Sequence, residues 1–218
     1  KFTSIDDTWP VERLEIATLN MARAVGIRTP EARLELAASR HPVGLIKRFD
    51  RRKGGRLPYM SARTALGKKG SAHGYYTDIA DALRQMSVLP DRDILELWRR
   101  LLFTVLITNT DDHLKNHGFL YVRDNRWRLS PMFDVLPLLD EGPARQLSMS
   151  VGIDGPRISR ANLLSQHEHF ALTLAEAEHT LEEVASWADA LKDHYADFLQ
   201  GEDLRLAQAA TTSAFILG

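Results

Sequence analysis

Apolar residues recur at two different spacings along this chain, and the spacings predict where helices and strands lie. Leu14, Ala17, Met21 and Val25 recur at intervals of three and four residues, which predicts an amphipathic helix over 11–25. A proline stands just before this stretch and a glycine just after it, as at many helix ends. The stretch is therefore the first helix that the sequence predicts.

Strand-like runs flank this helix. Lys1-Phe2-Thr3 is typical of the end of a strand, and residues 33–38 and 43–49 read as two further strands. The residues between the latter two, Ser39-Arg40-His41-Pro42, are typical of a turn. We therefore expect strand, helix, strand, strand over residues 1–50.

The rest of the chain is predicted to be mainly helical, with one hairpin and two irregular stretches. Glycine and polar residues make 56–75 an irregular connection, and 136–156 lacks periodicity and is a long loop, a type that is often functional. Asp124-Asn125 is a favourable turn pair for a hairpin. The predicted strands are 119–122 and 126–129, and the predicted helices are about 77–87, 90–107, 159–166, 174–199 and 203–214.

The composition is that of an ordinary soluble globular protein. The 218 residues are 44% hydrophobic and 26% charged, and the net charge of -1 gives no overall basic field for nucleic acid. The absence of cysteine excludes disulfides and cysteine-rich zinc sites. The longest strongly apolar stretch, 101–107, is far shorter than the roughly 20 residues of a membrane span. We expect a cytoplasmic protein without membrane contact, and a charged first residue in place of Met indicates a piece of a longer chain.

The candidate chemistry lies in a polar break between a predicted helix and the hairpin, Asn109-Thr110-Asp111-Asp112-His113-Leu114-Lys115-Asn116. Asp111 and Asn116 are five residues apart, and Asp134 follows the hairpin. This order of Asp-x4-Asn, two strands and Asp is the layout of a phosphoryl-transfer site. One Asp takes or orients the acceptor hydroxyl, while the Asn and the second Asp offer hard oxygen ligands to magnesium. Lys115 would steady the γ-phosphate or the acceptor.

Two other interpretations of this segment remain open on spacing alone. Asn-Thr-Asp-Asp is a natural turn, because Asx side chains bond their own backbone. His113 and His117 are four residues apart and would face one zinc ion if the segment were helical, although its Asn and Gly content argues against a helix. We otherwise expect His113 to brace the loop through a hydrogen bond of its ring.

Beyond their spacing, the residue sequences of these segments resemble those of a known family. NTDDHLKNHGFLY and the later LSPMFDVLP are similar to the C-terminal kinase region of the HipA family, the serine/threonine kinase toxins of bacterial toxin–antitoxin modules. The family has the same N-T-D-x-H-x-K-N and P-x-[FY]-D-[VIL] stretches. LIKRFDRR with GRLPYMSA resembles its adenine-holding strand and hinge, and RLEIATLNMARAVGIRTP resembles the helix after its nucleotide-binding lysine. The similarity covers roughly residues 1–150.

The resemblance implies an α+β fold of the protein-kinase-like, two-lobed type. Residues 1–53 would be a partial N-terminal lobe of strand, helix, two strands and hinge. Residues 54–218 would be a larger, mainly helical C-terminal lobe that carries the catalytic loop and the metal-binding hairpin.

The resemblance also implies roles for single residues. Asp111 would be the catalytic base, with Lys115 and His113 beside it in the catalytic loop. Asn116 and Asp134 would be magnesium ligands.

The nucleotide would be held by the N-terminal part of the chain. Lys1 would contact the α- and β-phosphates of ATP, and Glu15 would pair with Lys1. The main-chain groups of Lys47 and Phe49 would bond the adenine edge. The plainer alternatives are a chain-end lysine, an exposed helix glutamate and a phenylalanine that only packs in the core.

The function implied is that of an ATP- and Mg²⁺-dependent serine/threonine protein kinase. Its substrate would be a serine of a translation protein such as an aminoacyl-tRNA synthetase, of the glutamyl type in the family, and its role that of a toxin causing growth arrest or persistence. One alternative is a kinase-like regulatory module that acts with a helix-turn-helix antitoxin in operator repression and reaches DNA only through it. Another is a small-molecule phosphotransferase.

One feature of the family is not found in the sequence. A glycine- and serine-containing phosphate-binding loop, with the serine that becomes autophosphorylated, precedes the lysine strand in the family, whereas this sequence begins at Lys1. The expectation is that these residues alone bind ATP weakly and turn over poorly.

Overall fold

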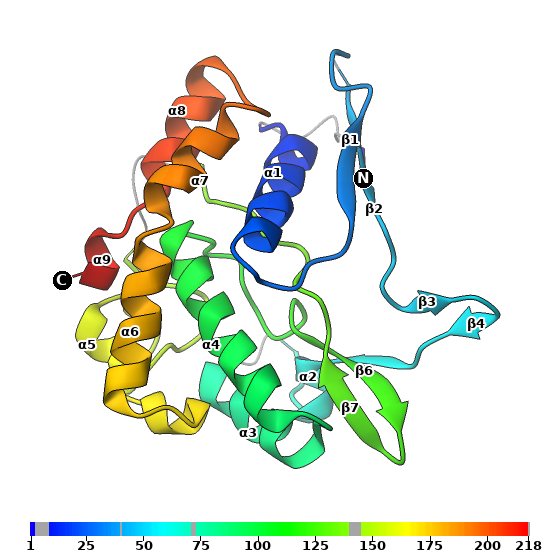
Figure 1. The fold of residues 1–218 in the computed structure, drawn as a ribbon, viewed down its shortest axis with the longest axis vertical. Helices are drawn as coiled ribbons and strands as arrows, with labels where there is room; N and C mark the ends of the chain where they lie inside the picture. The colour runs from blue at the N-terminus through cyan, green and yellow to red at the C-terminus, as the bar shows by residue number, and fades with distance from the viewer. Residues whose placement is uncertain (3–8, 40, 71–72, 140–144, 218) are drawn as a thin grey trace.

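The computed structural model describes residues 1–2, 9–39, 41–70, 73–139 and 145–217. Figure 1 shows a group of helices on one side and strands along the other, with the first helix, in blue, beside the orange helices that come late in the chain. The described helices and strands together give an α+β fold, as the sequence predicts.

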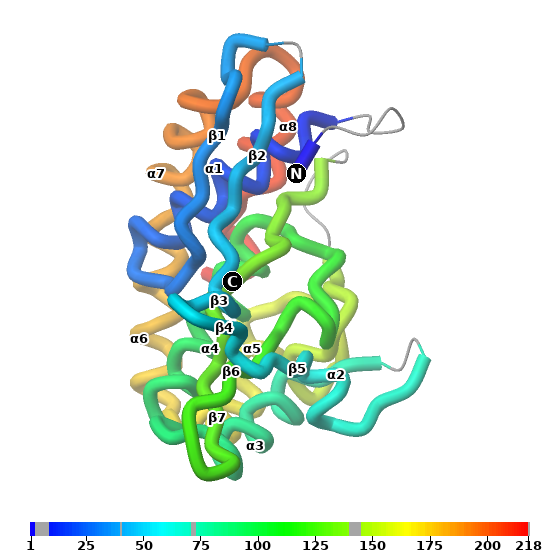
Figure 2. The backbone as a smooth tube through the Cα atoms, turned by 90° about the vertical axis from the view of Figure 1, so that its right-hand side faces the viewer, coloured from blue at the N-terminus to red at the C-terminus, as the bar shows by residue number. Residues whose placement is uncertain are grey.

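The N-terminal elements are a helix and a two-stranded antiparallel ribbon packed against it. Helix α1 (Val11–Ala24) contacts strands β1 (Ala32–Glu35) and β2 (Val43–Ile46), which pair with Ala32 opposite Ile46. Gly44 permits this approach, since a Cβ there would lie 3.3 Å from the Cβ of Glu12. Figure 2 shows the two strands running alongside α1. Both strands are shorter than predicted.

The start of the chain lies beside β2, as the strand-like ending predicts. Phe2 forms an antiparallel bridge with Val43, and the Gly44 N–H donates to the Lys1 carbonyl at 3.0 Å. Thr3 and the turn residue Arg40 lie outside the described residues. This pairing fixes Lys1 on the ribbon next to α1.

The prediction that 56–75 is an irregular connection is wrong in part, because Tyr59–Ser61 is a strand of a three-stranded sheet. Strand β5 (Tyr59–Ser61) pairs with β6 (Gly118–Arg123), and β6 pairs with β7 (Arg126–Leu129), all antiparallel. Three residues are too few to show the alternation that marks a strand. A short ribbon and a single helical turn flank β5: β3 (Arg51–Arg52), β4 (Gly55–Arg56) and α2 (Ala62–Ala65).

Helix α4 (Pro90–Leu106) forms the centre of the hydrophobic core. Trp98, Leu101 and Phe103 on it are fully buried. Helix α3 (Tyr76–Met86) packs on one side of α4 and helix α6 (Leu174–Ala185) on another (Figure 1). Burial of a large apolar side chain stabilises the fold by roughly 1.5–3 kcal/mol, so α4 is a rigid support for the loop that follows it.

The prediction of a single helix over 174–199 is wrong, because the helix is interrupted at Ser186-Trp187. Helix α6 ends before this point and α7 (Ala188–Tyr195) begins after it. The two halves pack on different partners, α6 on α4 and α7 on α1.

The helix predicted over 203–214 is also two helices, α8 (Gly201–Ala210) and α9 (Ala214–Leu217). Between them Thr211 is extended, and the Thr212 N–H donates to the Leu106 carbonyl at 2.9 Å. This bond ties the C-terminal segment to the end of α4.

The remaining elements are short. Within the long loop predicted over 136–156, residues 140–144 lie outside the described part, and the rest forms only isolated bridges. No helix among the residues placed by the structure combines the length and apolarity that a membrane crossing needs. The helices not yet named are α5 (Arg160–Leu164) and the 3-10 helix η1 (His167–Phe170).

Candidate active site

The predicted catalytic loop leaves the C-terminal end of α4 and is fixed there by its backbone. Thr108 has a φ of 56°, a left-handed conformation that turns the chain sharply out of the helix. The Asn109 N–H donates to the Thr104 carbonyl at 3.0 Å, and the Leu138 N–H donates to the Thr108 carbonyl at 3.1 Å. The loop after α4 and the segment that follows the hairpin are thereby held side by side.

The two adjacent aspartates of the loop have different environments. Asp112 is buried and accepts hydrogen bonds from the hydroxyl of Tyr76 and, at 3.0 Å, from the Nε2 of His117. Asp111 is exposed. Asp112 therefore anchors the loop to α3, and Asp111 is the carboxylate that faces solvent.

Asn116 connects the three predicted residues of the site. Its side-chain Nδ2 donates to the carbonyl of Asp111 and to the carbonyl of Asp134, at 3.4 Å each. The amide oxygen of Asn116 is thereby left to accept from, or to ligate, another group. Asp134 has a φ of 55°, a conformation uncommon outside glycine that marks a constrained position.

Lys1 links α1 to this site. Its Nζ lies 2.5 Å from the Oε2 of Glu15 and 2.8 Å from the Oδ1 of Asp134. Burial opposes the charge of Lys1, but the hydrogen bonds to Asp134 and Glu15 outweigh it and raise the pKa of the ammonium. Burial also raises the pKa of Glu15, against the opposing effect of Lys1. The ion pair expected between Lys1 and Glu15 is present, and it includes Asp134.

A pocket of about 510 Å³ opens beside this triad. Three aromatic rings line it, Phe49 with Phe133 at 5.4 Å between centroids and Tyr59 at 6.2 Å from Phe49. Lys47 also lines it, but its N–H donates to the Glu31 carbonyl, so its carbonyl is the main-chain group left for a ligand. An apolar, aromatic cleft with a few polar groups suits a flat heterocyclic ring.

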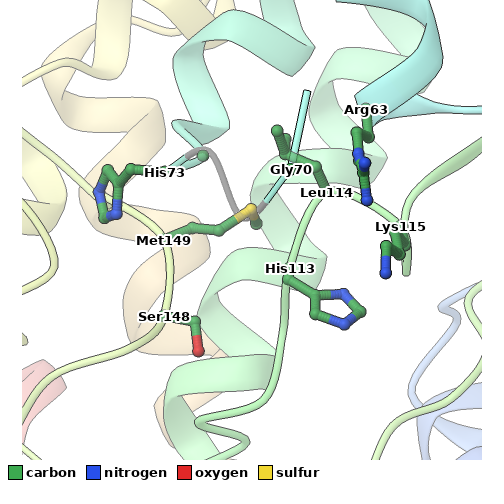
Figure 3. A pocket seen from close by; sticks show the side chains of 9 residues that line it. Arg63, Gly70, His73, His113, Leu114, Lys115, Ser148 and Met149 are labelled. Carbon is green, nitrogen blue, oxygen red and sulfur yellow. The ribbon is translucent and has the colours of Figure 1, made fainter. Parts of the chain in front are cut away.

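A second pocket of similar volume is lined by residues of the loop itself (Figure 3). His113 and Lys115 line it together with Arg63. The Nδ1 of His113 is buried without a hydrogen-bond partner among the described residues, so that atom does not brace the loop. His117 does so instead, through Asp112.

The structure thus links Asp111, Asn116 and Asp134 to Lys1 and Glu15. It places His113 and Lys115 in a separate pocket, and it adds three residues to the site. Tyr76, Asp112 and His117 form the support of the loop. The last two were visible in the motif, but Tyr76 is far away in sequence and carries no signal of its own. In the described part of the chain, no group of three or more His, Cys, Asp or Glu could hold a metal ion. The segment from His113 to His117 is not helical, and the Nε2 of His117 bonds Asp112, so the condition set for a zinc site at these two histidines is not met.

Comparison with known proteins identifies the family of this chain. The family model HipA-like C-terminal domain matches residues 1–191. A protein of Sinorhizobium fredii named "Putative kinase Y4dM" is 29% identical over 210 residues, covering 90% of this chain and 50% of that protein. A "Putative kinase" of Haemophilus influenzae is 28% identical over 134 residues, covering 55% of this chain and 39% of that protein. The chain spans half or less of the length of these relatives.

Two solved structures share the fold. The HipA of Shewanella oneidensis MR-1, solved in a toxin–antitoxin complex with HipB and its operator DNA, has a TM-score of 0.77 at 18% identity and covers 95% of this chain and 55% of that one. The Helicobacter pylori proinflammatory kinase CtkA has a TM-score of 0.71 at 12% identity, covering 99% and 88%.

The fold is therefore kinase-like, of the type seen in HipA and CtkA. With most of its length matched by the family model, the chain belongs to the HipA-like C-terminal domain family.

Proposed function

We propose that this chain is the nucleotide- and metal-binding part of an ATP-dependent serine/threonine protein kinase. The observation that carries the proposal is the pair of bonds from the Asn116 amide to the carbonyls of Asp111 and Asp134. These bonds hold the proposed base and the proposed metal-binding carboxylate on the two sides of one amide. Such a fixed arrangement is what phosphoryl transfer needs, because positioning and charge stabilisation supply most of its catalysis.

The residues present fit magnesium. The amide oxygen of Asn116 and the carboxylate of Asp134 are hard oxygen donors, and Mg²⁺ commonly takes one or two protein ligands and completes its shell with phosphates and water. A site with two protein ligands therefore agrees with the lack of a larger cluster among the described residues. Bound there, the ion would neutralise phosphate charge.

The nucleotide would lie between the aromatic pocket and Lys1. Phe49, Tyr59 and Phe133 would enclose the adenine ring, and the Lys47 carbonyl would accept from its amino group. The Lys1 ammonium, oriented by Glu15, would contact the phosphates. Its raised pKa keeps it charged at neutral pH.

Asp111 would act on the acceptor. Its exposed carboxylate would take the proton of the acceptor hydroxyl as that oxygen bonds to the γ-phosphorus. The bond from the γ-phosphorus to the bridging oxygen of ADP breaks in the same displacement, and ADP leaves. Lys115 would steady the γ-phosphate or the acceptor side.

We further propose that the acceptor is a serine of a translation protein, such as an aminoacyl-tRNA synthetase, and that the full protein acts as a growth-arresting toxin in the cytoplasm. The solved complex of the Shewanella HipA with HipB and operator DNA supports a helix-turn-helix antitoxin as partner. It also favours a second candidate function, a regulatory module in operator repression that contacts DNA through the antitoxin.

The first prediction tests the site. The full-length protein, incubated with magnesium and γ-labelled ATP in a cell lysate, should label a protein band. Asp111→Ala and Asp134→Ala should each lower the labelling by about a thousandfold or more, since catalytic and charge-stabilising groups each contribute roughly 10²–10⁴. Asp189→Ala, which removes an exposed carboxylate on α7, is the control and should label normally.

Labelling that survives both site changes would show that the assigned residues are not the catalytic ones. An intact protein that binds no ATP would instead favour the regulatory module. Growth arrest on overexpression that persists in Asp111→Ala would point to the same conclusion, because repression or sequestration needs no base.

A further inference from the structure

Two adjoining pockets form a basic groove beside the catalytic loop. Their volumes are about 510 and 420 Å³, and both are lined by Arg63 and Lys115. Figure 3 shows these two side chains on one side of the first pocket and His73 with Ser148 on the other. We call the two pockets together the basic groove. Its remaining lining residues are Ser61, Thr64, Gly67, Lys68, Gly70, His73, Gly74, His113, Leu114, Ser148 and Met149.

The charge of the basic groove is of one sign. Neither pocket has an Asp or Glu in its described lining. Lys68 forms an ion pair with Asp78 at 3.4 Å, but Arg63 and Lys115 form none within the described chain. Arg63 only donates from its Nε to the Lys68 carbonyl, at 3.5 Å. Two uncompensated cations therefore face the same space.

The basic groove adjoins the base and not the nucleotide pocket. Lys115 directly precedes Asn116, and the Ser148 hydroxyl donates to the carbonyl of Thr110, the residue before Asp111. The groove shares no lining residue with the aromatic pocket. A molecule in the groove would thus approach Asp111 from the acceptor side.

We propose that the basic groove binds the acidic flank of the protein segment that carries the acceptor hydroxyl. This inference rests on the proposed kinase function and adds its substrate class. Asp or Glu side chains next to the acceptor would pair with Arg63 and Lys115. Neither cation would have to give up an ion pair within the described chain. Leu114 and Met149 give the groove an apolar floor suited to a peptide. Among the described residues, its lining contains no Phe, Tyr or Trp on which nucleic-acid bases would stack.

The test compares three synthetic peptides with the full-length protein. Each has one central serine, flanked by Glu and Asp, by Ala, or by Lys and Arg. Dye-labelled versions measure binding by fluorescence anisotropy, and labelled ATP measures phosphorylation. We expect the acidic peptide to bind at least tenfold more tightly than the basic one, and this preference to weaken as salt rises.

Substitution of Arg63 separates a specificity role from a structural one. Arg63→Glu should weaken binding of the acidic peptide about tenfold or more and raise its KM, with kcat for the neutral peptide little changed. Arg63→Gln keeps a hydrogen-bond donor for the Lys68 carbonyl. Its affinity for the acidic peptide should lie between those of the unaltered protein and Arg63→Glu. Arg123→Glu, an equal charge change on the exposed end of β6, should have no effect.

The outcomes keep the two proposals apart. Acidic and basic peptides that bind equally, or an Arg63→Glu protein with unchanged preference, would overturn the groove while leaving the kinase intact if ATP still binds and turns over. Tighter Arg63-dependent binding of a single-stranded oligonucleotide of equal charge would assign the groove to nucleic acid instead. Loss of ATP binding in the unaltered protein would contradict the kinase proposal itself.

Discussion

At the scale of single residues, neighbours distinguish the buried Asp112 from the exposed Asp111, which we propose as the base. Asp111 and Asp112 are adjacent, yet only Asp112 reaches the buried Tyr76 and His117. A buried carboxylate that accepts hydrogen bonds from two donors is a structural anchor. Losing either donor would leave a buried charge with too few hydrogen bonds. The exposed Asp111 keeps its charge available to an acceptor.

Tyr76→Phe should therefore destabilise the protein without touching the reacting groups. At neutral pH we expect the free energy of unfolding to fall by about 1–3 kcal/mol, the usual cost of removing one partner of a buried polar group. Urea unfolding of the two proteins measures this difference. An unchanged free energy would mean that His117 alone satisfies Asp112.

The same substitution should alter the response to alkali. Burial and then the charge of Asp112 raise the pKa of Tyr76 well above its ordinary 10.0. The folded protein therefore keeps a proton that the unfolded chain releases above about pH 10, so stability falls as pH rises from there through the folded pKa. Tyr76→Phe should show a shallower fall above about pH 10. An equally steep fall would show that other groups cause the loss of stability at high pH. One such group is the buried Tyr195, because burial also raises its pKa.

At the scale of elements, a close strand contact shapes the proposed nucleotide pocket. Gly118 begins β6 opposite Ser61 of β5, and a Cβ there would lie 2.2 Å from the ring of Tyr59. Tyr59 is 39% exposed, so its ring can move at low cost. The position of the Tyr59 ring, and with it the contact to Phe49, therefore depends on the absence of a side chain at Gly118.

Gly118→Ala should consequently weaken nucleotide binding more than it weakens the fold. We expect the Kd for a fluorescent ATP analogue to rise severalfold, with a change in unfolding free energy of about 1 kcal/mol, the typical size for a point substitution. Tyr59→Leu is the matched comparison and should raise the Kd similarly. Unchanged affinity in both variants would show that Tyr59 does not contact the base.

At the scale of the whole molecule, the proposed ATP site draws on distant parts of the chain. Lys1, Glu15 and Phe49 come from the first fifty residues, and Phe133 and Asp134 follow the hairpin. Whether 1–53 and 54–218 behave as two lobes remains a proposal, but a ligand here would contact both segments. Binding would thus stabilise both segments together.

This linkage gives a measurable expectation. With magnesium and ATP at about one hundred times the Kd, the unfolding free energy should rise by about 2.7 kcal/mol. Hydrogen exchange should slow both in β2 and in the segment after β7. Asp134→Ala should lose the magnesium-dependent part of this gain. Protection confined to one of the two segments would argue against a site shared between them.

Much of the molecule followed from the sequence. The helices α1, α3 and α4 and the β6–β7 hairpin lie within a few residues of their predicted positions, because each has a long apolar period or a strong turn pair. The family motif likewise singled out Asp111, Asn116 and Asp134, whose spacing along the chain reflects the chemistry.

Tertiary structure alone decided the rest. Strand β5 exists because β6 offers it hydrogen-bonding groups, and α6 and α7 separate at Ser186-Trp187 because their packing partners differ. Tyr76 supports the catalytic loop, and Arg63 lies beside Lys115, through contacts between residues far apart in sequence. Local periodicity records which face of an element is buried, but not which distant side chain it meets, so these parts of the site needed the folded chain.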